Sequence, residues 1–257
     1  MSEKLKITFL GTGTSQGIPV IACECPVCVS EDLRDKRLRT SAMLETGGKV
    51  FVIDTGPDFR QQMLREKVKR LDAVIFTHEH KDHLGGLDDV RAFNYVLRKY
   101  VEVYAGEGVQ VALRREYPYI YEEKKYPGIP LINIHTIENK PFIIEGVEFI
   151  PIEVMHYLMP VFGYRIGDFT YITDAKTIPE KEKEKIYGSK VIVLNALRIQ
   201  EHISHFTLDE AVEQLKEFKP ERAYLTHISH QLGKHEDVEK NLPDFIRLAY
   251  DGLKIEV

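Results

Sequence analysis

Residues 76–83 read Phe-Thr-His-Glu-His-Lys-Asp-His and place three histidines and one aspartate within six positions. They follow directly on an apolar run at 73–76, which predicts a buried strand that ends where these side chains begin. Histidine and carboxylate groups are ligands of zinc and similar metals. The alternative is a solvated polar loop, but the whole chain has only ten histidines. The stretch therefore predicts a metal site.

Four other residues that can bind a metal each follow a predicted strand: Asp54, His156, Asp174 and His227. The strands expected before them cover residues 50–53, 147–154, 169–173 and 223–226. Ligands of open α/β sheets gather at the carboxyl ends of the strands. We therefore expect these side chains and the 76–83 stretch to form one site.

The three cysteines, Cys23, Cys25 and Cys28, have the spacing C-x-C-x-x-C. Three cysteines this close together make a poor disulfide framework, whereas three thiolates suit a tetrahedral zinc that takes a fourth ligand from elsewhere. Because the chain has no fourth cysteine, we expect a histidine to complete such a site. The alternative is that the cysteines are buried as small apolar side chains, which Glu24 and Pro26 in the same loop disfavour.

The composition is that of a soluble globular protein, with 43% hydrophobic and 29% charged residues in 257 positions. We expect a single domain over residues 1–257. A net charge of −5 and the lack of a basic patch make nucleic acid an unexpected partner. No apolar run approaches the ~20 residues that a membrane span needs, and no hydrophobic signal segment is present. We expect a cytoplasmic protein without membrane association, and we also consider a homodimer.

Two loops near predicted strand ends carry further signals. After a strand at 6–10, residues 11–17 read Gly-Thr-Gly-Thr-Ser-Gln-Gly, but the GxGxxxG spacing and the lack of a following helix pattern disfavour a dinucleotide-binding loop. Farther along, Thr207 and Glu210 form a capping box for a helix with an apolar face at 208–218. His202 and His205 lie just before this helix start, where free backbone N–H groups favour an anion such as phosphate.

Other segments receive structural expectations only. Helices are expected at 59–68 and 87–98. Segment 117–126 holds four tyrosines among charged residues and is either a lid over a pocket or a solvated surface excursion, with the surface excursion slightly favoured. We expect His135 to be a half-buried strand residue and His235 to lie on the surface, and neither to have a chemical role.

The pattern His-x-His-x-Asp-His at 78–83 resembles the signature of the metallo-β-lactamase superfamily. Asp54, His156, Asp174 and His227 follow in the order of that superfamily's other motifs, so the resemblance spans essentially the whole chain. It implies an α/β fold, an αββα sandwich of two similar halves, with a dinuclear metal site at one edge of the sheets. Residues 9–15 and the cysteine cluster are similar to the PhnP branch of phosphodiesterases, which is related to tRNase Z.

The resemblance also implies a role for each site residue. The implied ligands are His78, His80 and His156 for one catalytic ion, Asp82, His83 and His227 for the other, and Asp174 between them. Asp54 would orient the ligand loop through hydrogen bonds. The fourth ligand of the structural zinc would be His230, three residues after the last active-site histidine. His205, or less closely His202, matches the histidine beside the scissile phosphate. The residues expected to take part in catalysis are His205 and Asp82.

The implied activity is hydrolysis of a small anionic phosphodiester, cyclic ones included, by a hydroxide held between two zinc or manganese ions. His205 as an imidazolium would protonate the leaving oxygen or neutralise the phosphoryl oxygens. The ligand types do not distinguish zinc from manganese. Alternatives on this scaffold are a tRNA 3′-processing nuclease, a thioesterase, a lactonase, or a binding protein such as one resembling PqqB. The lack of a basic, Gly-Pro-rich arm disfavours the nuclease, and the complete ligand set disfavours a binding protein.

Overall fold

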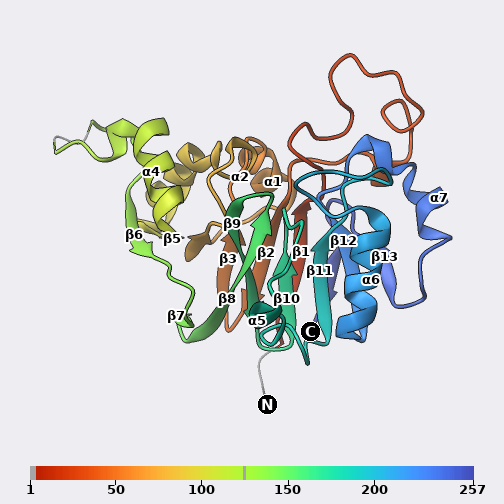
Figure 1. Cartoon of the computed structure of the whole chain (residues 1–257). Coiled ribbons are helices and arrows are strands. Elements are labelled where there is room, and N and C mark those ends of the chain that lie inside the picture. Colours follow the sequence, from red (N-terminus) through yellow and green to blue (C-terminus); the bar gives the residue numbers. More distant parts are fainter. Residues whose placement is uncertain (1–3, 124–125) are drawn as a thin grey trace.

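The computed structural model describes residues 4–123 and 126–257, which form two mixed seven-stranded sheets (Figure 1). In spatial order, the first sheet contains β14 (Lys254–Glu256), β1 (Lys6–Gly11), β2 (Ser41–Thr46), β3 (Lys49–Ile53), β4 (Ala73–Ile75), β5 (Val101–Ala105) and β6 (Ile132–Thr136). The second contains β13 (Ile246–Leu248), β12 (Arg222–Thr226), β11 (Val191–Asn195), β10 (Phe169–Ile172), β9 (Met159–Ile166), β8 (Val147–His156) and β7 (Phe142–Ile144).

Each half of the described chain repeats one plan. In the first sheet β3 to β6 are parallel, while β14, β1, β2 and β3 pair antiparallel. In the second sheet β10 to β13 are parallel, while β7, β8, β9 and β10 pair antiparallel. The C-terminal strand β14 departs from a strict division into halves, because it pairs with β1 in the first sheet.

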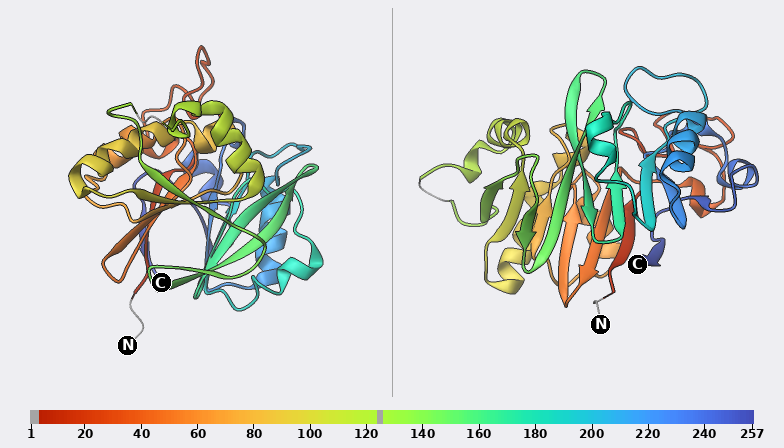
Figure 2. Two further views of the ribbon diagram at one scale, coloured as in Figure 1. Left: turned by 90° about the vertical axis from the view of Figure 1, so that its left-hand side faces the viewer. Right: turned by 60° about the horizontal axis from the view of Figure 1, so that its bottom comes forward.

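The helices lie on the outer faces of the two sheets (Figures 1 and 2). They are α1 (Phe59–Arg65), α2 (Lys81–Leu84), α3 (Arg91–Leu97), α4 (Glu107–Glu116), α5 (Glu180–Lys183), α6 (Leu208–Phe218) and α7 (His235–Glu239). Short 3₁₀ turns cover Leu33–Asp35, Leu87–Val90, Pro118–Ile120 and His230–Leu232. No helix among the described residues is both long enough and apolar enough to cross a membrane.

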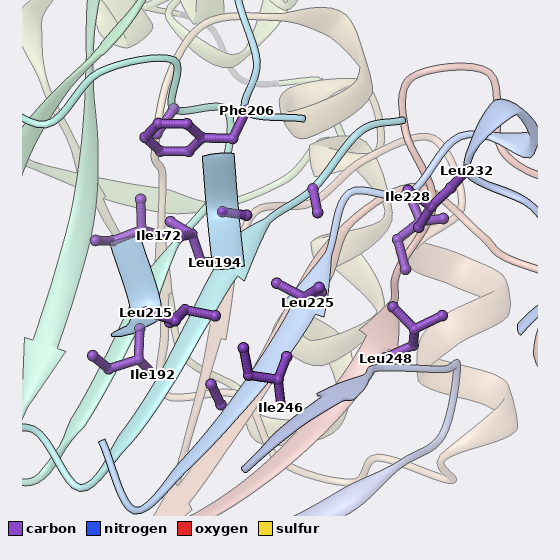
Figure 3. Close-up of a cluster of buried hydrophobic side chains, with 14 of the residues drawn as sticks. Ile172, Ile192, Leu194, Phe206, Leu215, Leu225, Ile228, Leu232, Ile246 and Leu248 are labelled. Carbon is purple, nitrogen blue, oxygen red and sulfur yellow. The ribbon is translucent and has the colours of Figure 1, made fainter. Parts of the chain in front are cut away.

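Three apolar clusters hold these layers together. The cluster between the sheets includes Phe51 and Phe149, whose rings pack edge to face with centroids 5.5 Å apart. A second cluster joins α1, α3 and α4 to the first sheet. The third joins α6 to the second sheet through Leu215, Ile192 and Leu225 (Figure 3). Each large side chain buried in this way contributes roughly 1.5–3 kcal/mol. This layering confirms the predicted αββα sandwich.

The helix at the capping box forms as predicted. The Thr207 hydroxyl accepts a hydrogen bond from the Glu210 N–H at 3.2 Å, and the Glu210 carboxylate accepts one from the Thr207 N–H at 2.8 Å. Other helix boundaries differ from the sequence pattern. α1 ends at Arg65, shortly before Lys67 takes a left-handed conformation, and the expected helix at 87–98 divides into a 3₁₀ turn and α3. The residues at which these helices begin and end depend on tertiary packing, and the hydrophobic pattern of the sequence carries no information on that packing.

One surface prediction was wrong and another holds for only part of its segment. His235 is buried, because its Nδ1 accepts from the Arg37 guanidinium at 3.1 Å while its backbone N–H donates to Asp35. In segment 117–126, Tyr117 joins the core and donates its hydroxyl to the Leu84 carbonyl, so this end of the segment is not solvated. The same segment includes residues 124–125, which lie outside the described residues. His135 lies on β6 as predicted, but its side chain is exposed.

Candidate metal centre

The predicted site residues meet at one edge of the two sheets, where strands from both halves end. Asp54 follows β3, His78 follows β4, and His156 ends β8. Asp174 and His227 come directly after β10 and β12. Burial is nearly complete for Asp54, His78, Asp174 and His227.

Three of these residues hold a backbone conformation that side chains other than glycine rarely adopt. The φ angles are 63° for Asp54, 57° for Asp174 and 56° for His227. A left-handed conformation at a residue other than glycine costs roughly 1–2 kcal/mol. Such costs concentrate at functional sites, where the surrounding structure fixes the geometry. Beside Asp174, the Asn195 side chain accepts from the Ala175 N–H at 2.7 Å and donates to the Ala175 carbonyl at 2.9 Å, which holds this loop in place.

One group of donor atoms consists of Asp82, His83 and His227, which lie close enough to share one ion. The Nε2 of His83 is 3.2 Å from Asp82 Oδ2 and 3.3 Å from Asp174 Oδ2. The Nε2 of His227 is 3.2 Å from Asp174 Oδ1 and 3.8 Å from Asp82 Oδ2. Two imidazoles thus face the same two carboxylates. This group coincides with the ligand set expected for one of the two ions.

Two further donor groups meet at Asp174, whose carboxylate also faces His83 and His227 of the first group. The donor atoms of His78 lie close to those of His83 and Asp174, and those of His156 lie close to Asp174 and His205. His80 belongs to neither grouping and is exposed, although its ring is 4.7 Å from that of His78 and 5.1 Å from that of His156, measured between centroids. Asp174 therefore has the position expected of a residue between two ions.

Hydrogen bonds orient three of the histidines in the same way. His83 Nδ1 donates to Asp54 Oδ2 at 2.7 Å, and His156 Nδ1 donates to the Ser204 carbonyl at 2.9 Å. His78 Nδ1 lies 2.9 Å from the Thr77 hydroxyl, which itself donates to Asp54 at 2.8 Å. Nδ1 carries a hydrogen in each case, so Nε2 is the nitrogen whose lone pair a metal would bind.

Asp54 makes hydrogen bonds of the kind that its predicted orienting role requires. Its carboxylate accepts from the Thr77 N–H at 2.9 Å, from the Thr77 hydroxyl and from His83. Gly56, two residues on, permits the close approach of the two loops, because a Cβ at this position would lie 2.1 Å from the Asp82 carbonyl oxygen. The predictions from sequence did not assign roles to Thr77 and Ser204. For Thr77, the only signal in the sequence was a hydroxyl residue placed between the predicted strand and His78. No comparable signal pointed to Ser204.

The charges of this site are strongly coupled. Burial lowers the pKa of His83, but Asp174, Asp54 and Asp82 outweigh it and hold the pKa of His83 well above its usual value. Burial raises the pKa of Asp174, but His227 and His83 hold it well below the usual range. Without a metal, His83 is therefore protonated between ionised carboxylates. Burial, with His83 nearby, drives the pKa of His78 well below its ordinary value and keeps that ring neutral.

The donor set fits metal ions. Among the described residues, Nε2 of His78 and Nδ1 of His227 are buried without a hydrogen-bond partner. Nε2 of His83 and Nε2 of His227 face carboxylate oxygens at 3.2–3.8 Å without hydrogen-bond geometry. Leaving a buried polar atom unpaired costs about 1–3 kcal/mol, so native structures avoid it unless something else binds there. Imidazole and carboxylate donors suit zinc and manganese alike. These atoms are placed to hold divalent metals.

His205 lies at the side of this centre, with its ring 4.5 Å from that of His156 and 4.8 Å from that of His227, between centroids. Burial and the neighbouring His227 lower the pKa of His205 to about 2. The imidazole is therefore neutral in the protein as it stands, and the expected imidazolium requires the negative charge of a bound substrate. The His202 ring lies beside it, tilted by 38° with centroids 5.1 Å apart, and is less buried. The geometry thus favours His205 over His202 as the residue that faces the centre.

The cysteine cluster forms a separate group of four donors. His230 Nδ1 lies 3.3 Å from the sulfurs of Cys23 and Cys25 and 3.5 Å from that of Cys28. The Cys28 N–H, with help from His230, lowers the pKa of Cys25 to about 6, whereas burial raises the pKa of Cys28 to about 11. Three sulfurs and one imidazole nitrogen are a tetrahedral zinc donor set. The structure thus brings His230 to the three cysteines, as the resemblance implied.

The cysteine cluster is tied through the backbone to the catalytic edge. The Ile228 N–H donates to the Thr12 carbonyl at 2.9 Å, and the Thr14 N–H donates to the Ile228 carbonyl at 3.0 Å. Ile228 directly follows His227. The N-terminal glycine loop therefore supports the His227 loop, which is also the loop that carries His230.

Comparison with known proteins agrees with this geometry. Residues 49–228 match the family model described as a β-lactamase superfamily domain. The chain belongs to this superfamily. A crystal structure of a diphosphatase from the PhnP family is 40% identical, with a TM-score of 0.93 over 99% of this chain and 97% of the other. This likeness confirms the predicted metallo-β-lactamase fold and the PhnP-like branch.

Two curated relatives from bacteria carry other names. An octanoyltransferase of Porphyromonas gingivalis is 38% identical over 97% of this chain and 51% of its own length. A ribonuclease Z of Nostoc sp. is 29% identical over 64% of this chain and 47% of its own length. This chain therefore spans about half the length of these curated relatives. The comparisons support a hydrolase of the metallo-β-lactamase fold and leave the substrate to be inferred from the site.

Proposed function

We propose that this protein is a metal-dependent hydrolase of small phosphodiesters, cyclic ones included. The observation that carries the proposal is the pair of donor groups that share Asp174, with the imidazole Nε2 atoms of His83 and His227 placed against the carboxylates of Asp82 and Asp174. Two adjacent divalent ions are the usual way in which a protein neutralises both the entering and the leaving oxygen of a phosphoryl transfer.

Divalent ions bound there would supply hydroxide at neutral pH and neutralise phosphate oxygens. The residues of the chain perform the remaining tasks. His78, His80 and His156 would hold one ion, and His83, His227 and Asp82 the other. Asp54 fixes His83 with its Nε2 toward the centre. The neutral ring of His205, beside His156 and His227, would donate a hydrogen bond to the phosphate. It would also accept the proton that the attacking water gives up and pass it to the leaving oxygen.

Hydrolysis of a diphosphate bond is a second candidate. The structural relative at 40% identity is a diphosphatase of the PhnP family, and the chain covers nearly all of it. The esterified phosphorus of a diphosphate, like that of a phosphodiester, carries two bridging and two non-bridging oxygens, so the same residues would serve either reaction. Acyl transfer and RNA cleavage have less support, because the relatives with those names are about twice the length that this chain matches.

The proposal is tested by measuring the hydrolysis of known substrates by protein of known metal content. The protein is freed of metal, reloaded with Zn²⁺ or Mn²⁺, and assayed with bis(p-nitrophenyl) phosphate and a panel of cyclic phosphates and diphosphates. We expect metal-dependent hydrolysis of a diester, and a His83→Ala and His227→Ala double variant to lose both metal and turnover. Hydrolysis of diphosphates alone would favour the second candidate. No turnover of any member with either metal would contradict the proposed function.

A further inference from the structure

We propose that Arg198 is a positioning residue, which holds the loop of residues 199–205 and thereby sets the place of the His205 imidazole beside the metal centre. The inference rests on the proposed function and deepens it, because it assigns the residue that keeps His205 where a substrate phosphate would meet it. Arg198 follows Asn195, the last residue of β11, by three positions.

The loop between β11 and α6 has little support from its own backbone (Figures 1 and 2). Its two ends are joined, because the Leu197 N–H donates to the Phe206 carbonyl at 2.9 Å. The Leu208 N–H also donates to the Arg198 carbonyl at 3.0 Å. Between these ends, no backbone group of residues 199–205 bonds to another backbone group of the described chain. Such a loop can move without unfolding the protein, so side chains must fix it.

The Arg198 guanidinium holds the first half of this loop. Its Nε donates to the Gln200 carbonyl at 3.2 Å, and its Nη2 donates to the Glu201 carbonyl at 2.7 Å. Its Nη1 donates to Gln231 Oε1 at 2.9 Å. A planar guanidinium donates in several fixed directions at once, whereas a lysine ammonium is a compact point charge. Arg198 can therefore keep the two carbonyls in one arrangement relative to Gln231.

The second half of the loop is held at Ser204, directly before His205. The Ser204 carbonyl accepts from His156 Nδ1 at 2.9 Å. His156 is expected to hold a metal ion, whereas Arg198 is a purely structural support of the same loop. The contacts of Arg198 can therefore be removed without changing the expected ligand set. With the loop fixed only near Ser204, the His205 ring would keep one of its two supports.

Gln231 joins this loop to the loop that follows β12 and begins with His227. The Gln231 N–H donates to Ser229 Oγ at 3.1 Å, so the residue that accepts from Arg198 is itself fixed by a short turn. The His227 ring lies 4.8 Å from that of His205, between centroids. Arg198 thus holds the loop of one of these imidazoles against the loop of the other.

A double-mutant cycle on metal-loaded protein tests the inference, with the substrate that gives the highest turnover. Arg198→Gln should lower kcat by about 10- to 100-fold, the scale of effect of a misplaced catalytic group, and leave KM and metal content unchanged. In the His205→Ala background the same substitution should lower kcat by less than about threefold, because the group that it misplaces is gone. An equal loss in the two backgrounds would overturn the inference. So would a raised KM at unchanged kcat, because Arg198 would then bind substrate.

Arg165→Gln is the matched control. The Arg165 guanidinium also donates to loop carbonyls, those of Gly167, Lys185 and Tyr187 at 2.7–2.9 Å, but near the other end of β9 from Met159. This variant should keep the wild-type kcat. Arg198→Lys replaces Arg198→Gln if the latter fails to fold, and it should lose part of the activity because it lacks the planar fork. Full activity of Arg198→Lys would then contradict the inference.

Limited proteolysis reports on the loop without any turnover. A glutamyl endopeptidase cuts after Glu201, whose carbonyl accepts from Arg198, and mass spectrometry identifies the cut bond. In Arg198→Gln we expect cleavage there to become at least about threefold faster at an unchanged melting temperature, because the loop opens more often. Unchanged cleavage would overturn the inference. If the wild type hydrolyses no phosphodiester or diphosphate, the proposed function alone fails, and faster cleavage after Glu201 still assigns the support of this loop to Arg198.

Discussion

Asp54 Oδ2 lies 2.7 Å from His83 Nδ1, and this contact links the orienting network of the site to its donor atoms. Both groups are fully buried. The carboxylate fixes which nitrogen of His83 carries the hydrogen, and it contributes to the raised pKa of that ring. Together with Thr77, Asp54 thus connects the end of β3 to the loop that follows β4.

Asp54→Asn should weaken metal binding by about 10- to 100-fold, the usual effect of losing a group that orients a metal ligand. The Thr77 N–H, the Thr77 hydroxyl and His83 all donate to the Asp54 carboxylate. The NH₂ group of an asparagine would face at least one of these donors and could not accept its hydrogen. Zinc affinity measured by competition with a chromogenic chelator checks the prediction. Asp168→Asn, which changes an exposed aspartate paired with Lys190, should bind zinc normally. Unaltered affinity in Asp54→Asn would show that the network is dispensable.

Metal affinity should fall steeply as pH is lowered. The pKa of His83 is raised without metal, so a bound ion must displace a proton from this ring, and protons compete more strongly at lower pH. Calorimetric titration of metal-free protein in buffers of different ionisation enthalpy should detect the released proton near neutral pH. Proton release that is absent at pH 7 would contradict the protonated state of His83.

His205→Ala should leave the metal content intact and reduce kcat by about 10²- to 10⁴-fold, the usual contribution of a proton-transferring group. His205 is not needed to complete the ligand set expected for either ion, although its donor atoms lie near His156 and Asp174. Metal analysis and steady-state kinetics on one preparation separate these outcomes. Loss of one ion would identify His205 as a ligand, and unchanged turnover would remove it from the reaction. His202→Ala, outside the inner group, should have the smaller effect.

Cys25→Ser should remove one zinc per chain and lower the melting temperature by about 5 °C or more, since loss of a metal site is among the changes that cost several kcal/mol. The lowered pKa of Cys25, about 6, favours the thiolate that zinc needs. Elemental analysis and thermal unfolding measure both effects. Glu24→Gln, in the same loop, should keep zinc and stability. Free thiols at all three cysteines in wild-type protein, with two metals per chain, would contradict the zinc assignment.

His235 should make the fold sensitive to acid. Burial and the neighbouring Arg37 lower the pKa of His235 below the ordinary 6.5, so the folded chain keeps this ring neutral. Below pH 6.5 the unfolded chain takes up a proton that the folded chain does not, and stability falls as pH decreases. In His235→Asn the side-chain oxygen can still accept from Arg37 and does not titrate. Denaturant unfolding at pH 7.5 and 5.5 should show a smaller loss for this variant than for wild type.

Local patterns predicted much of the fold. The capping box joins Thr207 and Glu210, which are three positions apart, so it can be recognised from the sequence alone. The apolar run before His78 predicted a buried strand for the same reason. In contrast, β9 was not predicted, and the ends of α1 and α3 were misplaced, because these depend on packing against the sheets. His235 was placed on the surface because its partners, Asp35 and Arg37, lie about 200 positions away.

By itself, the sequence determined the kind of chemistry at this edge: imidazoles and carboxylates placed directly after apolar strands, with three thiols near the start of the chain. Only the tertiary structure decided which atoms face one another. It showed that Asp174 is shared by two donor groups and that His80 lies beside His78 and His156 without joining either group. It also showed that His205 is too buried to be charged on its own. The physical reason is that residue types and strand ends are local properties, whereas distance, burial and charge coupling arise when separate strands meet.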